Sequence, residues 1–259
     1  MSRTIASSRI RRRVSLLLLG VLTAAGTVPS AGGQWTGMPF APGERLTYAV
    51  SFGPLHVASG SMELSTGDSI RGHPTFHAVF RLHGGMFLFR VNDRIESWFD
   101  ASGSSLISLR FAQQLNEGRY HASRRFELFP DRGTYVEQGS PEQPSVSEPL
   151  DDVSFLYFLR TLPLEVGQRY EFHRYFQPEG NPVVITVMRR ERITLPAGTF
   201  DALVVRPEIS TEGLFAKGGR AEVWLRADSA HEVLQLRSHL AIGSLSLYLT
   251  GRERVEATR

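Results

Sequence analysis

Side-chain hydrophobicity alternates with a period of two along most of the chain after residue 34. In residues 46–52 (LTYAVSF) every even position is large and apolar, and residues 75–82 alternate in the same way. Further alternating runs lie at 119–128, 183–187, 203–205, 223–225 and 245–249. Successive side chains of a β-strand point to opposite faces, so this pattern predicts strands with one buried face.

Short turns separate these runs, with turn-forming residues at 116–118, 130–133, 178–181, 227–230 and 243–244. Connections of this length join neighbouring strands as antiparallel hairpins. The glycine pairs 84–85 and 218–219 are expected to mark turns or bulges. About a dozen strands are expected, more than a flat sheet usually carries. The predicted fold is therefore all-β and mainly antiparallel, a strongly curved sheet or a partly open barrel.

Residues 151–162 (DDVSFLYFLRTL) break this pattern and predict one short amphipathic helix. The helical spacing places on one side Phe155, Phe158, Leu159 and Leu162. Ser154, Tyr157 and Thr161 are expected on the other side. Asp151 or Asp152 can cap the first turn, and Pro163 ends the helix. The apolar stripe is expected to pack on the concave face of the sheet.

Residues 1–33 have the parts of a Sec-type signal peptide. An arginine-rich start precedes the mainly apolar residues 14–25, and small residues follow to Gly33. Cleavage is expected between Ser30 and Gly33, and an uncleaved anchor is the alternative. Since the chain has no cysteine, it is not expected to be a lipoprotein. Residues 34–259 are expected to form a single β-rich domain, with a possible internal boundary in the polar stretch 139–150.

The sequence pI of about 9.5 does not indicate a nucleic-acid partner. Residues 1–33 hold five arginines and no acid, which leaves 24 basic against 26 acidic residues in the rest of the chain. A nearly neutral domain lacks the positive charge that nucleic acids require. The absence of cysteine also excludes disulfides, thiolate zinc sites and cysteine nucleophiles. No segment after the leader is long and apolar enough to form a transmembrane helix.

No catalytic residue, metal ligand or cofactor site is predicted. His73, His77 and His83 could share a strand face, but positions four residues apart lie about 13 Å apart along a strand, too far for two ligands of one zinc ion. They are interpreted as solvent-facing histidines. Capping of the helix start is expected to explain at least one of Asp151 and Asp152. The chain contains neither a G-x-S-x-G nucleophile motif nor a phosphate-binding glycine loop.

Three residues are the candidates for ligand binding: Tyr157, Arg160 and Trp224. Tyr157 and Trp224 belong to a set of aromatic residues that could line a pocket for an apolar or sugar-like ligand, the others being Trp98, Phe87 and Phe89. Arg160 lies on the predicted helix, near the edge of the concave space. There it either pairs with a carboxylate or meets an anionic ligand.

Several short motifs, in this order, resemble the exported bacterial family called domain of unknown function 3108. They are Gly43–Tyr48 (GERLTY), Gly60, Asp152–Arg160 (DVSFLYFLR), Pro196–Phe200 (PAGTF), Trp224-Leu225 with Asp228, and Gly243–Leu245 (GSL). Arg226 departs from the serine that is frequent in the family. The resemblance covers about residues 42–251. It implies a β-rich protein of the periplasm or envelope, and it supplies no catalytic residues.

The first functional hypothesis is an exported, non-enzymatic envelope protein that binds an apolar or amphipathic ligand, or an envelope partner, on its concave face. Possible partners are a lipid, a glycan or an envelope protein. The expected fold is also similar, by analogy alone, to periplasmic carriers of lipoproteins. The alternative is a hydrolase of envelope polymers that uses Asp151 or Asp152 with a histidine. A third interpretation, an outer-membrane barrel, lacks clear aromatic girdles.

Overall fold

The computed structural model describes residues 37–86, 89–103, 105–210, 221–239 and 244–254. The predicted leader at 1–33 lies outside these residues, as does the glycine pair at 218–219. The described residues belong to a single compact unit.

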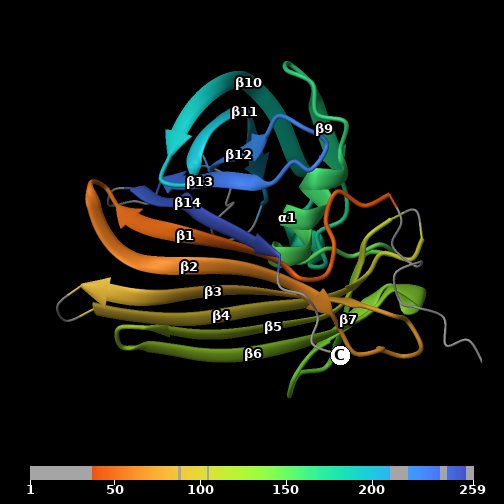
Figure 1. Ribbon diagram of the computed structural model, residues 1–259. Coiled ribbons are helices and arrows are strands. Elements are labelled where there is room, and N and C mark those ends of the chain that lie inside the picture. Colours follow the sequence, from red (N-terminus) through yellow and green to blue (C-terminus); the bar gives the residue numbers. More distant parts are fainter. Residues whose placement is uncertain (1–36, 87–88, 104, 211–220, 240–243, 255–259) are drawn as a thin grey trace, which may run out of the picture. The chain divides into compact units, whose positions relative to one another are not determined.

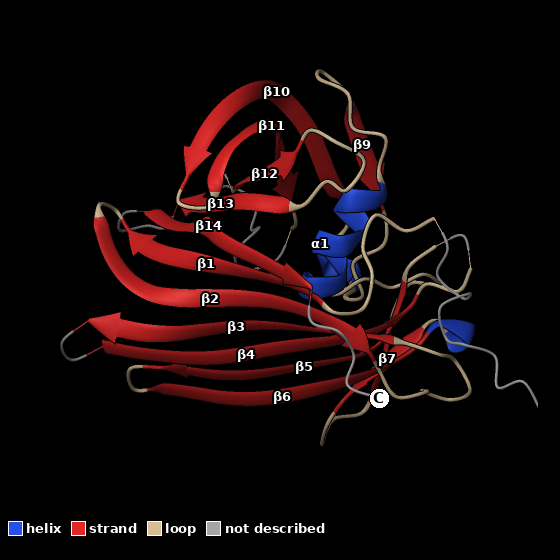
Figure 2. Ribbon diagram, viewed as in Figure 1, coloured by secondary structure: helices blue, strands red, loops and turns tan. Residues whose placement is uncertain are grey.

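The described part of the chain contains fourteen strands, which form one antiparallel sheet (Figure 1, Figure 2). This confirms the predicted all-β, antiparallel fold. The strands are β1 (Glu44–Phe52), β2 (Leu55–Thr66), β3 (Phe76–Met86), β4 (Phe89–Asp100), β5 (Ile107–Glu117), β6 (Tyr120–Phe129), β7 (Thr134–Glu137), β8 (Glu142–Pro144), β9 (Arg169–Phe172), β10 (Val183–Leu195), β11 (Gly198–Glu208), β12 (Glu222–Arg226), β13 (Val233–His239) and β14 (Ser244–Arg254).

The order of the strands explains why the sheet stays open. It is β8-β7-β6-β5-β4-β3-β2-β1-β14-β13-β12-β11-β10-β9. Apart from β8 and β9, strands that follow one another in the sequence are therefore paired, and the β1–β14 pair joins the first strand to the last. The edges β8 and β9 do not pair with each other. The helix α1 (Asp152–Thr161) lies in the connection between these two edges, and the sheet curves around it (Figure 1).

Hydrogen bonds hold the connection between β8 and β9 across the opening of the sheet. Leu150 and Tyr175 form an isolated parallel bridge, in which Leu150 N donates to the Arg174 carbonyl at 2.6 Å. Ser145 Oγ donates to the Phe176 carbonyl at 2.7 Å. The polar stretch 139–150 contains the short strand β8, which is paired with β7 in the same sheet.

Two of the predicted turns use glycine in the left-handed region. Gly118 (φ 60°) lies between β5 and β6, and Gly133 (φ 61°) follows the 3₁₀ turn Pro130–Arg132 before β7. The prediction of a turn or bulge at residues 84–85 is wrong, because both glycines pair regularly within β3. A Cβ on Gly84 would lie 2.5 Å from the Cα of Ala58, so glycine here permits a close approach of β2 and β3.

The helix α1 has the predicted limits. Asp151 is its N-cap, and its side chain accepts hydrogen bonds from the backbone N–H groups of Val153 and Ser154, both at 2.9 Å. Ser154 Oγ accepts from the Asp151 N–H at 2.9 Å, which completes a capping box. Leu162 is the C-cap, directly before Pro163.

The prediction of a polar side on this helix is only partly right. Every residue from Val153 to Arg160 is buried, including Ser154 and Tyr157, whereas Thr161 is partly exposed. The physical reason is that the sheet surrounds the helix instead of covering one stripe. The buried Ser154 hydroxyl is satisfied by a 2.7 Å hydrogen bond to Ser108 Oγ of β5.

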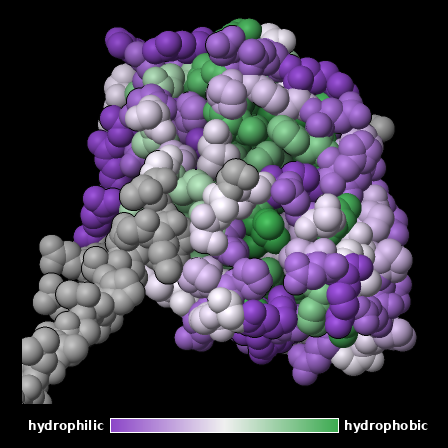
Figure 3. All heavy atoms as spheres, turned by 90° about the vertical axis from the view of Figure 1, so that its right-hand side faces the viewer, coloured by the Kyte–Doolittle hydropathy of each residue, from purple (hydrophilic) through white to green (hydrophobic). Residues whose placement is uncertain are grey.

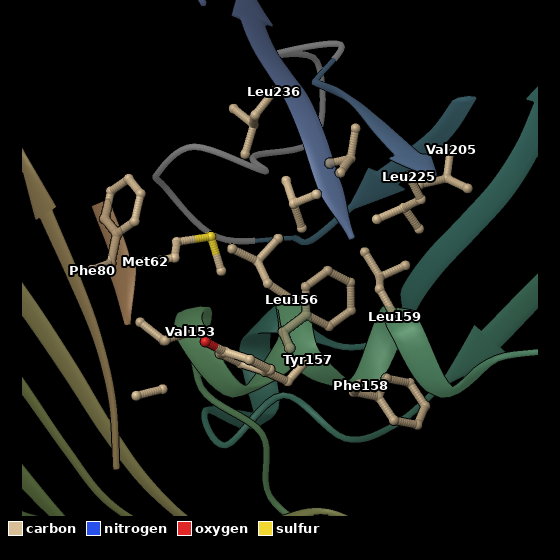
Figure 4. Packing of buried hydrophobic residues seen from close by; sticks show 14 of the residues in the cluster. Met62, Phe80, Val153, Leu156, Tyr157, Phe158, Leu159, Val205, Leu225 and Leu236 are labelled. Atoms are coloured by element: carbon tan, nitrogen blue, oxygen red, sulfur yellow. The ribbon is translucent and has the colours of Figure 1, made fainter. Parts of the chain in front are cut away.

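The concave face and the helix enclose one hydrophobic core (Figure 4). In this cluster Leu156 and Leu159 of α1 lie with Leu225 of β12, Leu236 of β13 and Met62 of β2. Fully burying one such side chain contributes about 1.5–3 kcal/mol. The helix thus joins both halves of the open sheet.

Candidate functional site

Arg160, one of the three predicted ligand-binding residues, is a buried clamp at the last turn of α1. Its guanidinium forms a bidentate ion pair with Glu44 at the start of β1, in which Nη2 donates to Oε2 at 2.9 Å. Nη2 also donates to the Pro39 carbonyl at 3.1 Å, and Nε donates to the Ala230 carbonyl at 3.1 Å. The sequence left two roles open for Arg160, pairing with a carboxylate or contact with an anionic ligand. In the structure Arg160 pairs with a carboxylate.

Burial and pairing act in opposite directions on this arginine. The residue is 1% exposed. Burial alone lowers the pKa of Arg160, but the hydrogen bonds and charge of Glu44 outweigh this effect and raise it. The guanidinium also lies 5.3 Å from the ring centre of Phe40 and 5.6 Å from that of Tyr157. Arg160 is therefore a permanently charged group that fixes the helix to β1 and to the β12–β13 turn.

Tyr157, the second predicted residue, lies one helical turn before Arg160 and is 1% exposed. Its ring packs edge-on against Phe40, with a centroid distance of 5.0 Å. Burial and the nearby charge of Glu44 raise the pKa of the Tyr157 hydroxyl. Tyr157 thus helps to position Phe40 and is not itself exposed to a ligand.

A groove of about 550 Å³ lies over this clamp. We call it the α1 groove. Its lining residues come from four parts of the chain: Met38, Pro39, Phe40, Ala41, Glu44, Leu46, Ser229, Ala230, Glu232, Arg252, Glu253 and Arg254. The volume falls in the range of about 300–1,000 Å³ that is typical of ligand pockets. Four of these residues contact Arg160 directly, so the clamp supports the groove from beneath.

The α1 groove has an apolar base and a charged rim. Phe40 and Leu46 at its base also belong to the hydrophobic core. On the rim, Glu232 pairs with Arg252 at 3.1 Å, and Arg254 lies opposite Glu44 in the β1–β14 register. Figure 3 looks onto the side of the molecule that is at the right in Figure 1, and shows apolar side chains between hydrophilic ones. Such a surface can hold a small apolar group together with charges of both signs.

Trp224, the third predicted residue, lies apart from this groove. It is 3% exposed and belongs to the same hydrophobic cluster as its β12 neighbours Val223 and Leu225. Its Nε1 donates to Glu191 Oε1 at 2.6 Å, and the Arg189 guanidinium lies 5.7 Å from the ring centre. Of the other aromatic candidates, Phe87 and the side chain of Phe89 lie outside the described residues.

Asp151 caps the helix as predicted, and Asp152 follows it in the first turn. Asp151 is fully buried, and besides its capping bonds it accepts a hydrogen bond from Ser97 Oγ at 2.6 Å. Asp152 accepts from Tyr175 Oη at 3.0 Å and from Gln113 Nε2 at 3.5 Å. Burial and the charge of Asp151 raise the pKa of Asp152 to about 6. Among the described residues, neither carboxylate has a hydrogen bond to a histidine.

The strand histidines have separate polar partners. His73 Nδ1 lies 3.0 Å from Asp100, and His83 Nδ1 lies 3.4 Å from Asn92 Oδ1. His77 corrects the expectation of full exposure, since it stacks on Trp98 at 4.3 Å and is half-buried. Burial lowers its pKa, against the effect of its Glu96 partner. The described residues hold no group of three or more potential metal ligands.

Sequence reasoning did not identify Phe40 and Glu44 as parts of the site. Phe40 precedes the first strand, outside any alternating run. Glu44 was noted only as part of the motif at residues 43–48. A buried arginine demands a carboxylate partner, but 116 residues separate the two. Only the β1–β14 pairing and the docking of α1 bring them together.

The fold and the α1 groove place the protein in a structural class. Its open antiparallel sheet curves around one buried helix, and beside the helix lies a groove as large as a typical ligand pocket. The family model described as "Protein of unknown function (DUF3108)" matches residues 47–250. The chain belongs to this family, as the motifs indicated. No curated protein matches the sequence significantly.

Three solved structures are similar over most of their length. The first is a β-barrel-like protein of domain of unknown function DUF1849 from Brucella abortus, with 9% identity, a TM-score of 0.49, and coverage of 81% of this chain and 96% of that one. A candidate lipoprotein from Parabacteroides distasonis has 11% identity and a TM-score of 0.37, with 83% and 97% coverage. A candidate exported protein with a YmcC-like fold from Bacteroides fragilis has 12% identity and a TM-score of 0.35, with 83% and 98% coverage.

The helix α1 has ten residues. Within the part of the chain that the structure describes, no helix combines the length and the apolar character needed to span a bilayer.

Proposed function

We propose that this protein is exported by a Sec-type signal peptide in residues 1–33 and, in the periplasm or outside the cell, binds an amphipathic ligand in the α1 groove without chemically changing it. The support for export is the order of positive, apolar and small residues in the leader. The binding role is supported by one observation. The groove combines an apolar base with a charged rim, and the Arg160–Glu44 ion pair beneath it holds both in place.

The lining of the groove favours a single-chain amphiphile with a zwitterionic headgroup. Met38 offers apolar surface to an acyl chain beside the buried Phe40, and the buried Arg160–Glu44 pair keeps this part of the groove in place. Arg252 and Glu253 on the rim present one positive and one negative group. A headgroup that carries both charges can satisfy both residues, whereas a purely anionic one would meet a carboxylate as well.

Binding is tested first without assuming a ligand. The protein is purified gently from its native host and examined by native mass spectrometry, which should detect a co-purifying lipid-sized mass. It is then titrated with lysophosphatidylethanolamine below its critical micelle concentration. A protein that carries no such mass and does not bind this probe would contradict the proposal, and a co-purifying protein alone would instead indicate an envelope partner.

A matched pair of variants locates the site. Met38→Glu places a charge at the apolar base of the groove and should weaken binding at least about tenfold, which corresponds to roughly 1.4 kcal/mol. Met188→Glu makes the same change at an exposed position of β10, where the side chain is 36% accessible, and should leave binding unchanged. Equal effects of the two substitutions would exclude the α1 groove.

Export is tested separately by cell fractionation and N-terminal sequencing. The proposal expects protein outside the cytoplasm that begins after a cleavage between Ser30 and Gly33. Recovery of the chain from the cytosol with residues 1–33 intact would contradict it.

A further inference from the structure

A second hollow, of about 390 Å³, lies on the convex face of the sheet across β14, β1, β2 and β3. We call it the outer groove. It exists because small side chains meet there in register: Thr47 of β1 lies opposite Ser61 of β2, and Ala49 lies opposite Ser59. The alternate residues of β1 face the core, so these four side chains belong to the opposite face.

Large basic or titratable side chains surround this depression. Arg45 lies at one end of the β1–β2 pair, and His56 lies near the other. On β3, Arg81 is opposite Ser61 and His83 is opposite Ser59. No carboxylate is among the residues that line the outer groove, so its character is basic and hydroxyl-rich.

The hydroxyl groups at the base of the groove are already oriented. Thr250 Oγ1 donates to Thr47 Oγ1 at 3.1 Å, and Thr47 Oγ1 donates to the Gly251 carbonyl at 3.3 Å. A Cβ on Gly251 would lie 3.0 Å from Thr47 Oγ1, so glycine keeps this part of the groove open. Because both O–H groups donate within the protein, these two hydroxyls can only accept a further hydrogen bond, for example from a sugar hydroxyl.

Arg81 is a cation for which the described residues show no ion-pair partner. Its Nη1 is buried and has no hydrogen-bond acceptor, and among the described residues no carboxylate lies within 4.0 Å of its guanidinium. The residue opposite Arg81 on β4 is Arg94, another cation, which is paired with Glu96. Arg45 is likewise paired, with Glu63 at 3.6 Å. Like charges on directly opposed strand positions disfavour each other, so an anion at Arg81 would relieve this repulsion.

We propose that the outer groove binds a phosphate monoester, with the Arg81 guanidinium as the principal contact and the hydroxyl of Ser59 as an additional donor. The planar fork of an arginine matches two phosphate oxygens. The groove lies on the face of the sheet opposite to the core, so this site is separate from the α1 groove and does not depend on the proposed function.

Two probes distinguish a soluble ligand from a lipid headgroup. Glucose 1-phosphate is titrated by calorimetry, and phosphatidic acid in phosphatidylcholine vesicles is tested by co-sedimentation with the full chain. Binding to either probe supports the site, and the probe that binds identifies the source of the phosphate. Uncharged glucose and pure phosphatidylcholine vesicles are the reference ligands and should not bind.

Arg81→Gln should weaken the binding of the active probe at least tenfold, and Arg81→Lys should weaken it less, because the charge remains while the fork is lost. The matched control is Arg119→Gln, at an exposed position in the β5–β6 turn, which should change the affinity less than twofold. Because the described residues give Arg81 no carboxylate partner and place Arg94 opposite it, Arg81→Gln should unfold at the same temperature as the wild type, or at a slightly higher one, when phosphate is absent. Failure of both probes, equal losses in the two glutamine variants, or a large drop in the unfolding temperature of Arg81→Gln would overturn the proposal.

Discussion

Replacing Glu44 by glutamine isolates the contribution of the buried clamp. The substitution keeps the shape of the side chain and one acceptor oxygen, but it leaves the Arg160 charge without its counter-ion. Arg160 is 1% exposed and the Glu44 side chain is 16% exposed, so solvent cannot replace the lost carboxylate. Removing one partner of a buried ion pair costs roughly 3–5 kcal/mol. Because glutamine retains one acceptor, we expect a loss of about 3 kcal/mol, at the lower end of that range.

The measurement is the free energy of unfolding of the purified protein by urea, supported by thermal unfolding. In a domain of this size about 1 kcal/mol shifts the melting temperature by roughly 2–4 °C, so Glu44→Gln should lower it by about 6–12 °C. A double-mutant cycle with Arg160→Met should give a coupling energy of at least about 2 kcal/mol, because the two residues form one hydrogen-bonded unit.

The chain offers a matched control at its surface. Arg124 and Glu137 also form a bidentate pair, at 2.7 and 3.0 Å, but their side chains are 43% and 29% exposed. Glu137→Gln should cost about 0.2–1 kcal/mol, since solvent screens an exposed pair. A loss for Glu44→Gln no larger than that for Glu137→Gln would refute the inference that Arg160 is a buried clamp.

Three further substitutions test other parts of the fold by the same unfolding assay. Burial raises the pKa of Asp152 from 3.8 to about 6. The ionised form therefore destabilises the folded state, by an amount that is absent below about pH 4 and complete above about pH 6. Asp152→Asn should thus stabilise the protein at pH 7 by about 1–3 kcal/mol and have little effect at pH 3.5, and an equal effect at both values would contradict this. Asp151→Ala removes two capping bonds and the acceptor for a buried serine, and should cost about 2–3 kcal/mol, in contrast to a near-neutral result if the cap is unimportant. Gly84→Ala forces a Cβ to within 2.5 Å of Ala58 and should destabilise the protein strongly, whereas Gly53→Ala, at φ 55° with no atom within 4 Å, should cost only about 1 kcal/mol. Equal losses at these two glycines would argue against a close approach of β2 and β3.

Local patterns predicted most of the fold. The alternation in residues 46–52 and the Asp151 cap depend on neighbours within one turn or a few positions of a strand, and such signals are visible in a single sequence. The burial of Tyr157 was not predicted, because it depends on how far the sheet curves around the helix. Gly84 was misread for a related reason, since the proximity of Ala58 follows from the pairing of two strands.

The candidate site was predictable only in part. The spacing in the helix placed Arg160 near the edge of the concave space and raised a carboxylate partner as one possibility. The identity of that partner, Glu44, depends on contacts between residues far apart in the chain. Trp224 is grouped with Tyr157 by residue type alone, whereas in the structure it is buried in β12, with Glu191 as the hydrogen-bond partner of its ring nitrogen. The position of Arg81 between Ser61 and Arg94 follows only from the strand register, which no local pattern contains.

Hydrogen–deuterium exchange with and without lysophosphatidylethanolamine tests the binding role of the α1 groove most directly. Bound ligand should slow backbone exchange in three segments that are distant in sequence, residues 38–46, 229–232 and 252–254, because together they line the groove. The Met188→Glu control should show the same protection, and Met38→Glu should lose it. Protection that is absent, or that falls on other segments, would contradict the assignment of the α1 groove as the binding site.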